Sequence, residues 1–139
     1  MSQIEIDLEI VVPSQTRYLA LIGNIAEQIG RGLPDYSGDR DGLAYILNLV
    51  LTEAIANAIE HTGCNRAESS VRIHIHLKKN DLCIQVHDQG KGFKLGEAPC
   101  PEPESPRGRG LFFIRNFMDT VCYRKTDGGN VLEMRKRLD

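Results

Sequence analysis

LTEAIANAIEH, residues 51–61, is the stretch on which the fold of this chain depends. Most of its side chains are apolar, and the polar ones recur at helical spacing: Glu53, Asn57, Glu60 and His61. This spacing places them on one stripe of an otherwise apolar helix, and such a helix is largely buried. Burial of a polar group costs free energy unless a partner compensates it. The stripe is therefore either the solvated face of an amphipathic helix or the wall of a ligand-binding cleft.

The helix that carries this stripe is predicted to be long. Asp39 or Asp41 can begin it, the apolar pattern continues to His61, and Gly63 ends it. A helix of this length crosses a whole domain, because each residue adds about 1.5 Å. The polar stripe thus lies toward its C-terminal end.

Two further elements are predicted before the long helix. Residues 4–12 alternate between apolar and acidic side chains, which is typical of a strand with one buried face, and Pro13 ends it. Ser14 is the expected N-cap of a helix that runs to about Gly30, with apolar residues every three or four positions. Residues 30–38 form a loop.

Strands follow the long helix. Alternating apolar residues predict a hairpin of strands 71–77 and 82–87. The histidines of this hairpin are interpreted simply as strand residues: His74, His76 and His87.

The last third of the chain begins with a long segment, 89–107, that is rich in glycine and proline. A loop of this length inside a compact domain is uncommon and usually functional. A short helix, 111–117, and a final hairpin of strands 120–125 and 131–138 are predicted after it.

This order of elements predicts the fold class. Hairpin-connected strands beside helices indicate an α/β (α+β) two-layer sandwich, with a mixed, mostly antiparallel sheet and about three helices on one face. A chain of 139 residues can bury a substantial core without disulfides or metals. Residues 1–139 are therefore assigned to a single domain.

The composition is that of a soluble globular protein, with 41% hydrophobic and 26% charged residues. The net charge of -2 gives no electrostatic reason to expect binding to nucleic acid or to an anionic membrane. The four cysteines contain no CxxC pair, which indicates reduced thiols in a cytoplasmic protein. The N-terminal residues have neither a basic start nor a long apolar run, so no signal peptide or transmembrane segment is expected.

Two glycine-containing motifs lie outside the long helix. Asp88-Gln-Gly-Lys-Gly-Phe93 follows a predicted strand, where a carboxylate can accept a hydrogen bond from an exocyclic amine and glycines let a ligand approach the backbone. An ordinary Asp-Gly turn is the alternative. Gly108-Arg-Gly110 opens a helix, where free N–H groups suit phosphates and Arg107 and Arg109 add positive charge. A flexible glycine joint is the alternative there.

Glu53 and Asn57 complete the set of candidate residues. The amide oxygen of Asn57 can coordinate Mg²⁺, an ion that takes the rest of its ligands from water and phosphates. Glu53, one turn earlier on the same face, can accept a proton from water or a hydroxyl group. Each motif is weak alone, but their order and their places on a helix, a strand end and a helix start are jointly specific.

With these motifs the chain resembles the GHKL superfamily of ATP-binding domains, which includes gyrase, Hsp90, histidine kinases and MutL. ExxxNAxxH at 53–61 is similar to its N box, and DxGxGF at 88–93 and GxG at 108–110 are similar to its glycine boxes. Residues 51–138 more narrowly resemble the bacterial anti-sigma-factor serine/threonine kinases, and the run GLFFIRNFMD at 110–119 is especially similar.

The resemblance implies the Bergerat (GHKL) ATP-binding fold and a role for each motif residue. Asn57 would coordinate Mg²⁺, Glu53 would be the general base, and Asp88 would hydrogen-bond the adenine amine. Residues 94–107 would form the ATP lid. The remaining contacts to ATP would come from Gly90, Gly92, Arg107, Gly108, Arg109 and Gly110.

The activity so implied is ATP- and Mg²⁺-dependent phosphorylation of a STAS-type anti-anti-sigma protein by a cytoplasmic homodimer that also binds a sigma factor. The alternative is a module that binds nucleotide and sequesters a partner without turnover. A base at Glu53 argues against it, because a pure binder needs none. Either Arg107 or Arg109 could approach the terminal phosphate, and Asn130 lies near a position where many members of the family have threonine.

Overall fold

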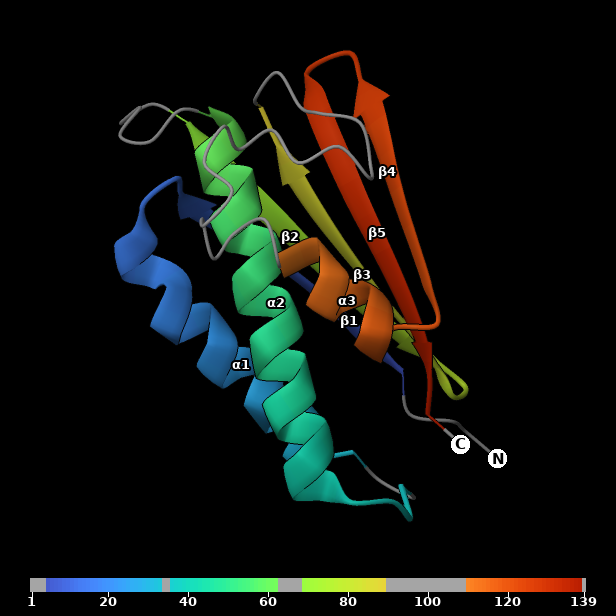
Figure 1. Cartoon of the computed structure of the whole chain (residues 1–139). Helices are drawn as coiled ribbons and strands as arrows, with labels where there is room; N and C mark the ends of the chain where they lie inside the picture. The colour runs from blue at the N-terminus through green and yellow to red at the C-terminus, as the bar shows by residue number, and fades with distance from the viewer. Residues whose placement is uncertain (1–4, 34–35, 63–68, 90–109, 139) are drawn as a thin grey trace.

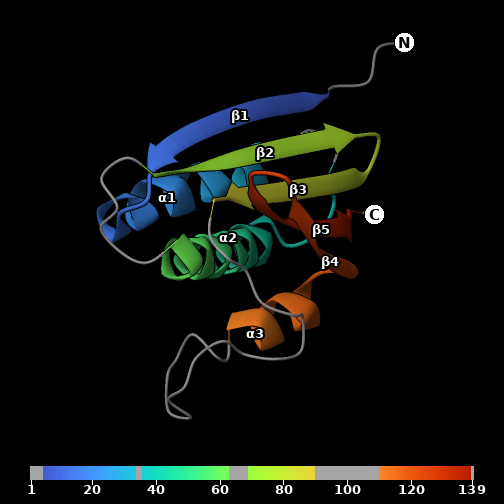
Figure 2. The same cartoon turned by 90° about the horizontal axis from the view of Figure 1, so that it is seen from above.

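The computed structural model describes residues 5–33, 36–62, 69–89 and 110–138. Within these ranges the chain forms a five-stranded sheet, three α-helices and a short 3₁₀ helix. Their bounds are β1 (Ile6–Pro13), η1 (Thr16–Tyr18), α1 (Leu19–Arg31), α2 (Arg40–Thr62), β2 (Ser70–Lys78), β3 (Asp81–Asp88), α3 (Gly110–Phe117), β4 (Thr120–Thr126) and β5 (Gly129–Arg137). The described helices all lie on one face of the sheet (Figure 1 and Figure 2). The predicted two-layer sandwich is confirmed.

The strand order in the sheet is β1-β2-β3-β5-β4, and every pairing is antiparallel. Among the described strands the sheet is therefore fully antiparallel, and not mixed as the sequence pattern predicts. The reason lies in the strand order. β3 and β4 run in the same direction, but β5 lies between them, so they form no parallel pair.

The buried core lies between the sheet and α2. Every second residue of β2 is buried, as the alternation predicts. α2 is most deeply buried over its C-terminal half, and its buried apolar residues include Leu47, Val50, Leu51, Ala54, Ile55, Ala58 and Ile59. Each such Leu, Ile or Val stabilises the fold by about 1.5–3 kcal/mol. By length and composition α2 could also cross a membrane, but 61% of its apolar window is buried inside the domain, so its apolar surface already has a protein partner.

α1 packs along α2 at close range because small residues meet where the helices cross. A Cβ atom on Gly30 would lie 3.0 Å from the Cα atom of Ala44, so the backbone of α2 leaves no room for a side chain there. Asn48 of α2 also donates a hydrogen bond to Glu27 of α1. α2 is thus held by α1 along one flank and by α3 and the sheet along others.

The starts of the first two helices differ in how well the sequence predicts them. Asp39, and not Asp41, caps α2, because its Oδ1 accepts the backbone N–H of Gly42 at 3.1 Å. The prediction of Ser14 as an N-cap is wrong. Ser14 is buried at the end of β1, where its backbone N–H donates to the carbonyl oxygen of Ser69 at 3.0 Å. The chain then turns through η1, and α1 begins without a side-chain cap.

The two cysteines in the described ranges, Cys83 and Cys122, are free. Burial raises the pKa of the Cys83 thiol, which therefore stays protonated at neutral pH. Cys64 and Cys100 lie outside the described residues.

The β4–β5 hairpin closes against the end of β3. Asp88, the last residue of β3, pairs with Asn130 of β5, and Gly129 precedes Asn130 with a φ of 158°. A Cβ atom on Gly129 would lie 1.8 Å from the carbonyl oxygen of Asp88, so only glycine allows this approach. Gly128, by contrast, has nothing within 4 Å of its Cβ position. One glycine of the turn is required for the contact with β3, and the other is not.

Gly129→Ala is expected to lower the free energy of unfolding by at least about 2 kcal/mol, because the new methyl group must push the hairpin away from the end of β3. Gly128→Ala is the matched control and should remain within about 0.5 kcal/mol of the parent protein. Urea denaturation followed by circular dichroism measures both changes. Equal stability of the two variants would contradict the constraint at Gly129.

Candidate functional site

α2 carries its polar stripe into the interior of the domain. Asn57 is only 6% exposed, and its Nδ2 group has no hydrogen-bond partner among the described residues. Glu53 and Glu60 are half-buried, and the side chain of His61 lies outside the described part. A buried N–H group without a partner costs about 1–3 kcal/mol, which a ligand that accepts its hydrogen bond would recover. At Asn57 the stripe is therefore not a solvated helix face.

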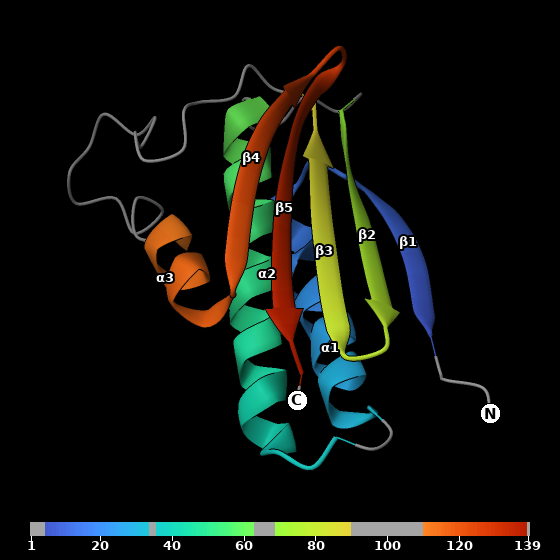
Figure 3. The same cartoon turned by 90° about the vertical axis from the view of Figure 1, so that its right-hand side faces the viewer.

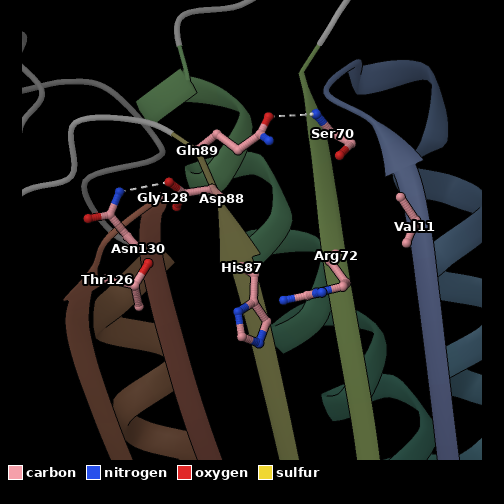
Figure 4. Close-up of a pocket in the computed structure, with 9 residues that line it drawn as sticks. All are labelled: Val11, Ser70, Arg72, His87, Asp88, Gln89, Thr126, Gly128 and Asn130. Carbon is pink, nitrogen blue, oxygen red and sulfur yellow. Dashed lines mark hydrogen bonds between the residues drawn. The ribbon is translucent and has the colours of Figure 1, made fainter.

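Asp88, at the end of β3, is a buried carboxylate with a fixed partner. It is 6% exposed and accepts a hydrogen bond of 2.8 Å from Nδ2 of Asn130, which is 1% exposed (Figure 4). Hydrogen bonds to carboxylates in surroundings of low polarity are stronger than those in water. The bond fixes the orientation of Asp88, and a fixed acceptor can select a ligand by the donors that the ligand offers.

Asn130 is a site residue whose partner the sequence does not reveal. In the sequence it is notable only as a departure from a threonine of the family. The strand register explains its role, because Asn130 lies directly opposite Asp88 in the β3–β5 pair and opposed side chains share a face of the sheet. These strands are not consecutive, so this register does not follow from local patterns.

Helix α2, which carries Glu53 and Asn57, packs against both β3, which ends in Asp88, and α3, which begins at Gly110. α2 and β3 finish at the same end of the domain, and α3 packs alongside α2 and β4 (Figure 1 and Figure 3). Gly110 begins α3, as the sequence predicts for a helix start at this motif. The predicted lid at 94–107 lies outside the described residues, as do the other predicted contacts to ATP: Gly90, Gly92, Arg107, Gly108 and Arg109.

Asn57 also has the chemistry of a magnesium ligand. No three histidine, cysteine, aspartate or glutamate side chains in the described part of the chain come together as a metal site. Mg²⁺ does not need such a cluster, because it keeps several waters and takes other ligands from phosphates. The amide oxygen of Asn57 is the atom that could coordinate the ion, and its unpartnered Nδ2 group could donate to a phosphate oxygen or to a water on the ion.

A pocket of about 450 Å³ opens at this end of the sheet (Figure 4). Its lining comes from several strands and the final turn: Val11, Ser70, Arg72, His87, Asp88, Gln89, Thr126, Gly128 and Asn130. Asp88 is one of the predicted contacts to ATP, and Asn130 is its partner. Arg72 and His87 lie on the helix-free face of the sheet and match none of the predicted contacts.

Known protein families agree with this arrangement. Residues 12–136 match the model of the histidine kinase-like ATPase domain. The chain belongs to this family. The GHKL resemblance of the sequence is thereby confirmed, and membership implies a domain that binds ATP.

Curated relatives place the chain among the anti-sigma-factor and kinase-like members of the family. An anti-sigma F factor of Anoxybacillus flavithermus is 33% identical over 99 residues, which cover 66% of this chain and 68% of the relative. The serine/threonine-protein kinase BtrW of Bordetella bronchiseptica is 24% identical over 98 residues, covering 66% and 69%. An anti-sigma F factor of Oceanobacillus iheyensis is 36% identical over 81 residues, covering 54% and 56%.

Solved histidine kinases share the fold. The histidine kinase domain of the blue-light activated kinase EL346 from Erythrobacter litoralis matches 91% of this chain with a TM-score of 0.55 and 18% identity. The histidine kinase AdeS of Acinetobacter baumannii matches 95% with a TM-score of 0.54 and 12% identity. This chain spans 62% of the first structure and 68% of the second, and at such identities the likeness concerns the fold alone.

Asn130→Ala should lower the free energy of unfolding by about 1–3 kcal/mol, because Asp88 stays buried and loses its amide donor. Asn116→Ala is the matched control. The Asn116 amide donates to a backbone carbonyl on the exposed surface of α3, so its loss should change stability by less than about 0.5 kcal/mol. Urea denaturation measures both. A cost for Asn130→Ala no larger than that for Asn116→Ala would mean that the buried bond adds no stability.

Proposed function

We propose that this domain is an ATP- and Mg²⁺-dependent serine/threonine protein kinase that acts as an anti-sigma factor and phosphorylates a STAS-type anti-anti-sigma partner. The observation that carries the proposal is Asn57, a buried amide with an unpartnered N–H group on the helix face that it shares with Glu53. Phosphoryl transfer depends on positioned polar groups and charge stabilisation more than on covalent chemistry.

In this proposal each described residue has one role. Glu53 would take the proton of the substrate serine or threonine hydroxyl while that oxygen forms a bond to the terminal phosphorus of ATP. The bond from this phosphorus to the bridging oxygen breaks in the same step, and ADP leaves. The amide oxygen of Asn57 would hold Mg²⁺, and the bound ion would supply positive charge that offsets the charge of the phosphates. Asp88, oriented by Asn130, accepts a hydrogen bond from the adenine amine. The lid is assigned to 94–107, and the remaining contacts to ATP are assigned to Gly90, Gly92, Arg107, Gly108, Arg109 and Gly110.

The relatives support the partner classes. One is named as an anti-sigma F factor and another as a serine/threonine-protein kinase, so the proposed partners are a sigma factor and its STAS-type antagonist in the cytoplasm. The proposal includes a homodimer, since β1 is an edge strand and Leu21 on the following helix is exposed. Analytical ultracentrifugation tests the dimer, and a monomer mass at every concentration would contradict it.

Transfer of labelled phosphate from ATP to a STAS-domain protein, with Mg²⁺ present, tests the kinase. Glu53→Gln should slow the transfer by about 10²–10⁴-fold, because it keeps the shape of the side chain and removes the base. Its ATP affinity should be unchanged. Glu60→Gln removes another half-buried carboxylate of the same helix and should transfer at the parent rate. Transfer by Glu53→Gln at the parent rate would exclude Glu53 as the base.

Asn57→Ala should weaken binding of Mg²⁺-ATP at least about tenfold. The substitution removes the amide that is proposed to contact the charged ion and phosphates. The same variant should be no less stable than the parent without ligand, since the N–H that it removes has no partner there. Isothermal titration calorimetry and urea denaturation measure the two effects. Unchanged affinity for Mg²⁺-ATP would contradict the ligand role.

The partner assay also separates the two functions that the sequence allows. Tight, nucleotide-dependent binding of the STAS-domain protein without any transfer of label would replace the kinase with a module that sequesters its partner.

A further inference from the structure

The helix-free face of the sheet carries positive charge near the end of β3. The strand register aligns five residues across this face, which we name the cationic row: Val11, Arg72, His87, Val131 and Arg124. Two positions further toward the strand ends, this face carries uncharged polar residues: Ser70, Gln89 and Thr126. Two positions in the other direction it carries two acidic residues: Glu9 and Glu133. A third, Asp127, lies in the β4–β5 turn between Thr126 and Gly128.

The pocket of about 450 Å³ lies against the cationic row. Arg72 extends from β2 toward β3, where the ring of His87 lies (Figure 4). Ser70 and Thr126 bring hydroxyl groups to the lining. Oε1 of Gln89 accepts the backbone N–H of Ser70 at 3.2 Å, which leaves the NH₂ group of Gln89 as a donor. Hydrogen-bond donors from several strands therefore converge on one cavity.

Arg72 differs from the other arginines of this face in its charge balance. Arg124, Arg135 and Arg137 lie 3.9, 3.2 and 3.6 Å from carboxylate oxygens. Arg72 has no ion pair and no hydrogen bond within the described part of the chain. Its guanidinium group can therefore take an anionic partner without giving up another.

His87 adds a second group that responds to an anion. Burial is the first cause that lowers the pKa of its imidazole. Neighbours on the same face act on this pKa as well: Arg72, His74 and Arg124 lower it, and Glu9 raises it. An anion beside the ring would raise the pKa of the His87 imidazole and so favour its protonated form.

The proton on the neutral His87 ring can be placed from its hydrogen bonds. Gln85 donates its NH₂ group to Glu133 at 2.8 Å, so its Oε1 is the acceptor that faces Nε2 of His87 at 3.2 Å. Nε2 therefore carries the proton, and Nδ1 is the position that gains one on protonation. Protonation would give the pocket both a positive charge and a further donor.

We propose that this pocket binds a phosphate monoester dianion, with Arg72 as its main ligand and His87, Ser70, Gln89 and Thr126 as further donors. The planar guanidinium group matches two phosphate oxygens at once, and hydroxyl and amide donors complete such a site. The cavity is larger than a phosphate group, so it also has room for the group to which the phosphate is esterified.

This site is separate from the proposed ATP site, although Asp88 lines the pocket too. Successive strand residues point to opposite faces, so His87 lies on the helix-free face and Asp88 on the face toward the helices. The Asp88 carboxylate accepts its bond from Asn130 on that side. The proposal goes beyond the kinase activity and does not depend on it.

Titration of the full chain with inorganic phosphate tests the site, followed by NMR of the His87 ring protons. A non-hydrolysable ATP analogue is kept in excess, so that the ATP site is filled. We expect the chemical shifts of these protons to change saturably with phosphate concentration. Arg72→Gln should weaken phosphate binding at least about tenfold, because it removes the positive charge and the paired N–H donors of the guanidinium group. Arg137→Gln, at the far end of the same face, is the matched control and should bind as the parent does.

Three results would overturn the site. They are the absence of a saturable shift at His87, equal weakening in the two arginine variants, and competition between phosphate and the ATP analogue. Arg72 is exposed, so its substitution should leave the amide spectrum of the folded protein in place.

Sulfate provides a second test, because it stays a dianion while the histidine titrates. Bound anion favours protonated His87, so affinity for sulfate should rise as the pH falls through the ordinary imidazole range, below about 6.5. In the His87→Gln variant this pH dependence should be absent, whereas Arg72 should still contribute to the affinity for sulfate. Sulfate affinity in the parent protein that does not change with pH would exclude His87 from the site.

The phosphate monoester could come from a small metabolite or from a phosphorylated side chain. Ribose 5-phosphate and a short phosphoserine peptide, each compared with its unphosphorylated form, separate these sources. Tighter binding of either phosphorylated probe than of inorganic phosphate supports the site and identifies the source. No gain from phosphorylation in either pair would overturn a phosphate monoester as the ligand.

Discussion

The burial of α2 is the constraint on which the rest of the structure depends. Where α2 is covered by α1, α3 and the sheet it has little contact with water, so each buried polar group there needs a partner in the protein or in a ligand. The apolar residues of α2 make the core stable enough to hold Asn57 with an unpartnered N–H. The same core therefore stabilises the fold and holds the Nδ2 group of Asn57 in a position where a ligand could accept its hydrogen bond.

A second constraint operates where β5 meets the end of β3. Gly129 permits the close approach, and Asn130 then holds the carboxylate of Asp88. The hairpin that makes this contact is the last element of the chain, whereas Glu53 and Asn57 lie near its middle. The candidate site is therefore complete only when the C-terminal hairpin has docked, so its assembly requires nearly the whole domain to fold.

Local patterns were enough to predict most of the elements, because hydrophobic spacing and turn residues act over a few positions. They predicted the long helix, with Asp39 as one of two possible starts, and both hairpins. They failed where distant segments decide the outcome. The backbone N–H of Ser14 donates to the carbonyl oxygen of Ser69, so Ser14 ends β1 and does not cap a helix. The sheet is fully antiparallel because β5 lies between β3 and β4. The partnership of Asn130 with Asp88 depends on the same long-range register.

The alternation of His87 and Asp88 across the sheet has a consequence for how this family can vary in length. A deletion or insertion of one residue within β3 would exchange the two faces, bringing the imidazole into the core and the carboxylate to the open side. Such a change would displace Asp88 from the helix-covered face and His87 from the outer pocket at once, and no single compensating substitution would restore both. Length variation among homologues should therefore avoid β3 and accumulate in the connections, where no side chain has to keep its face.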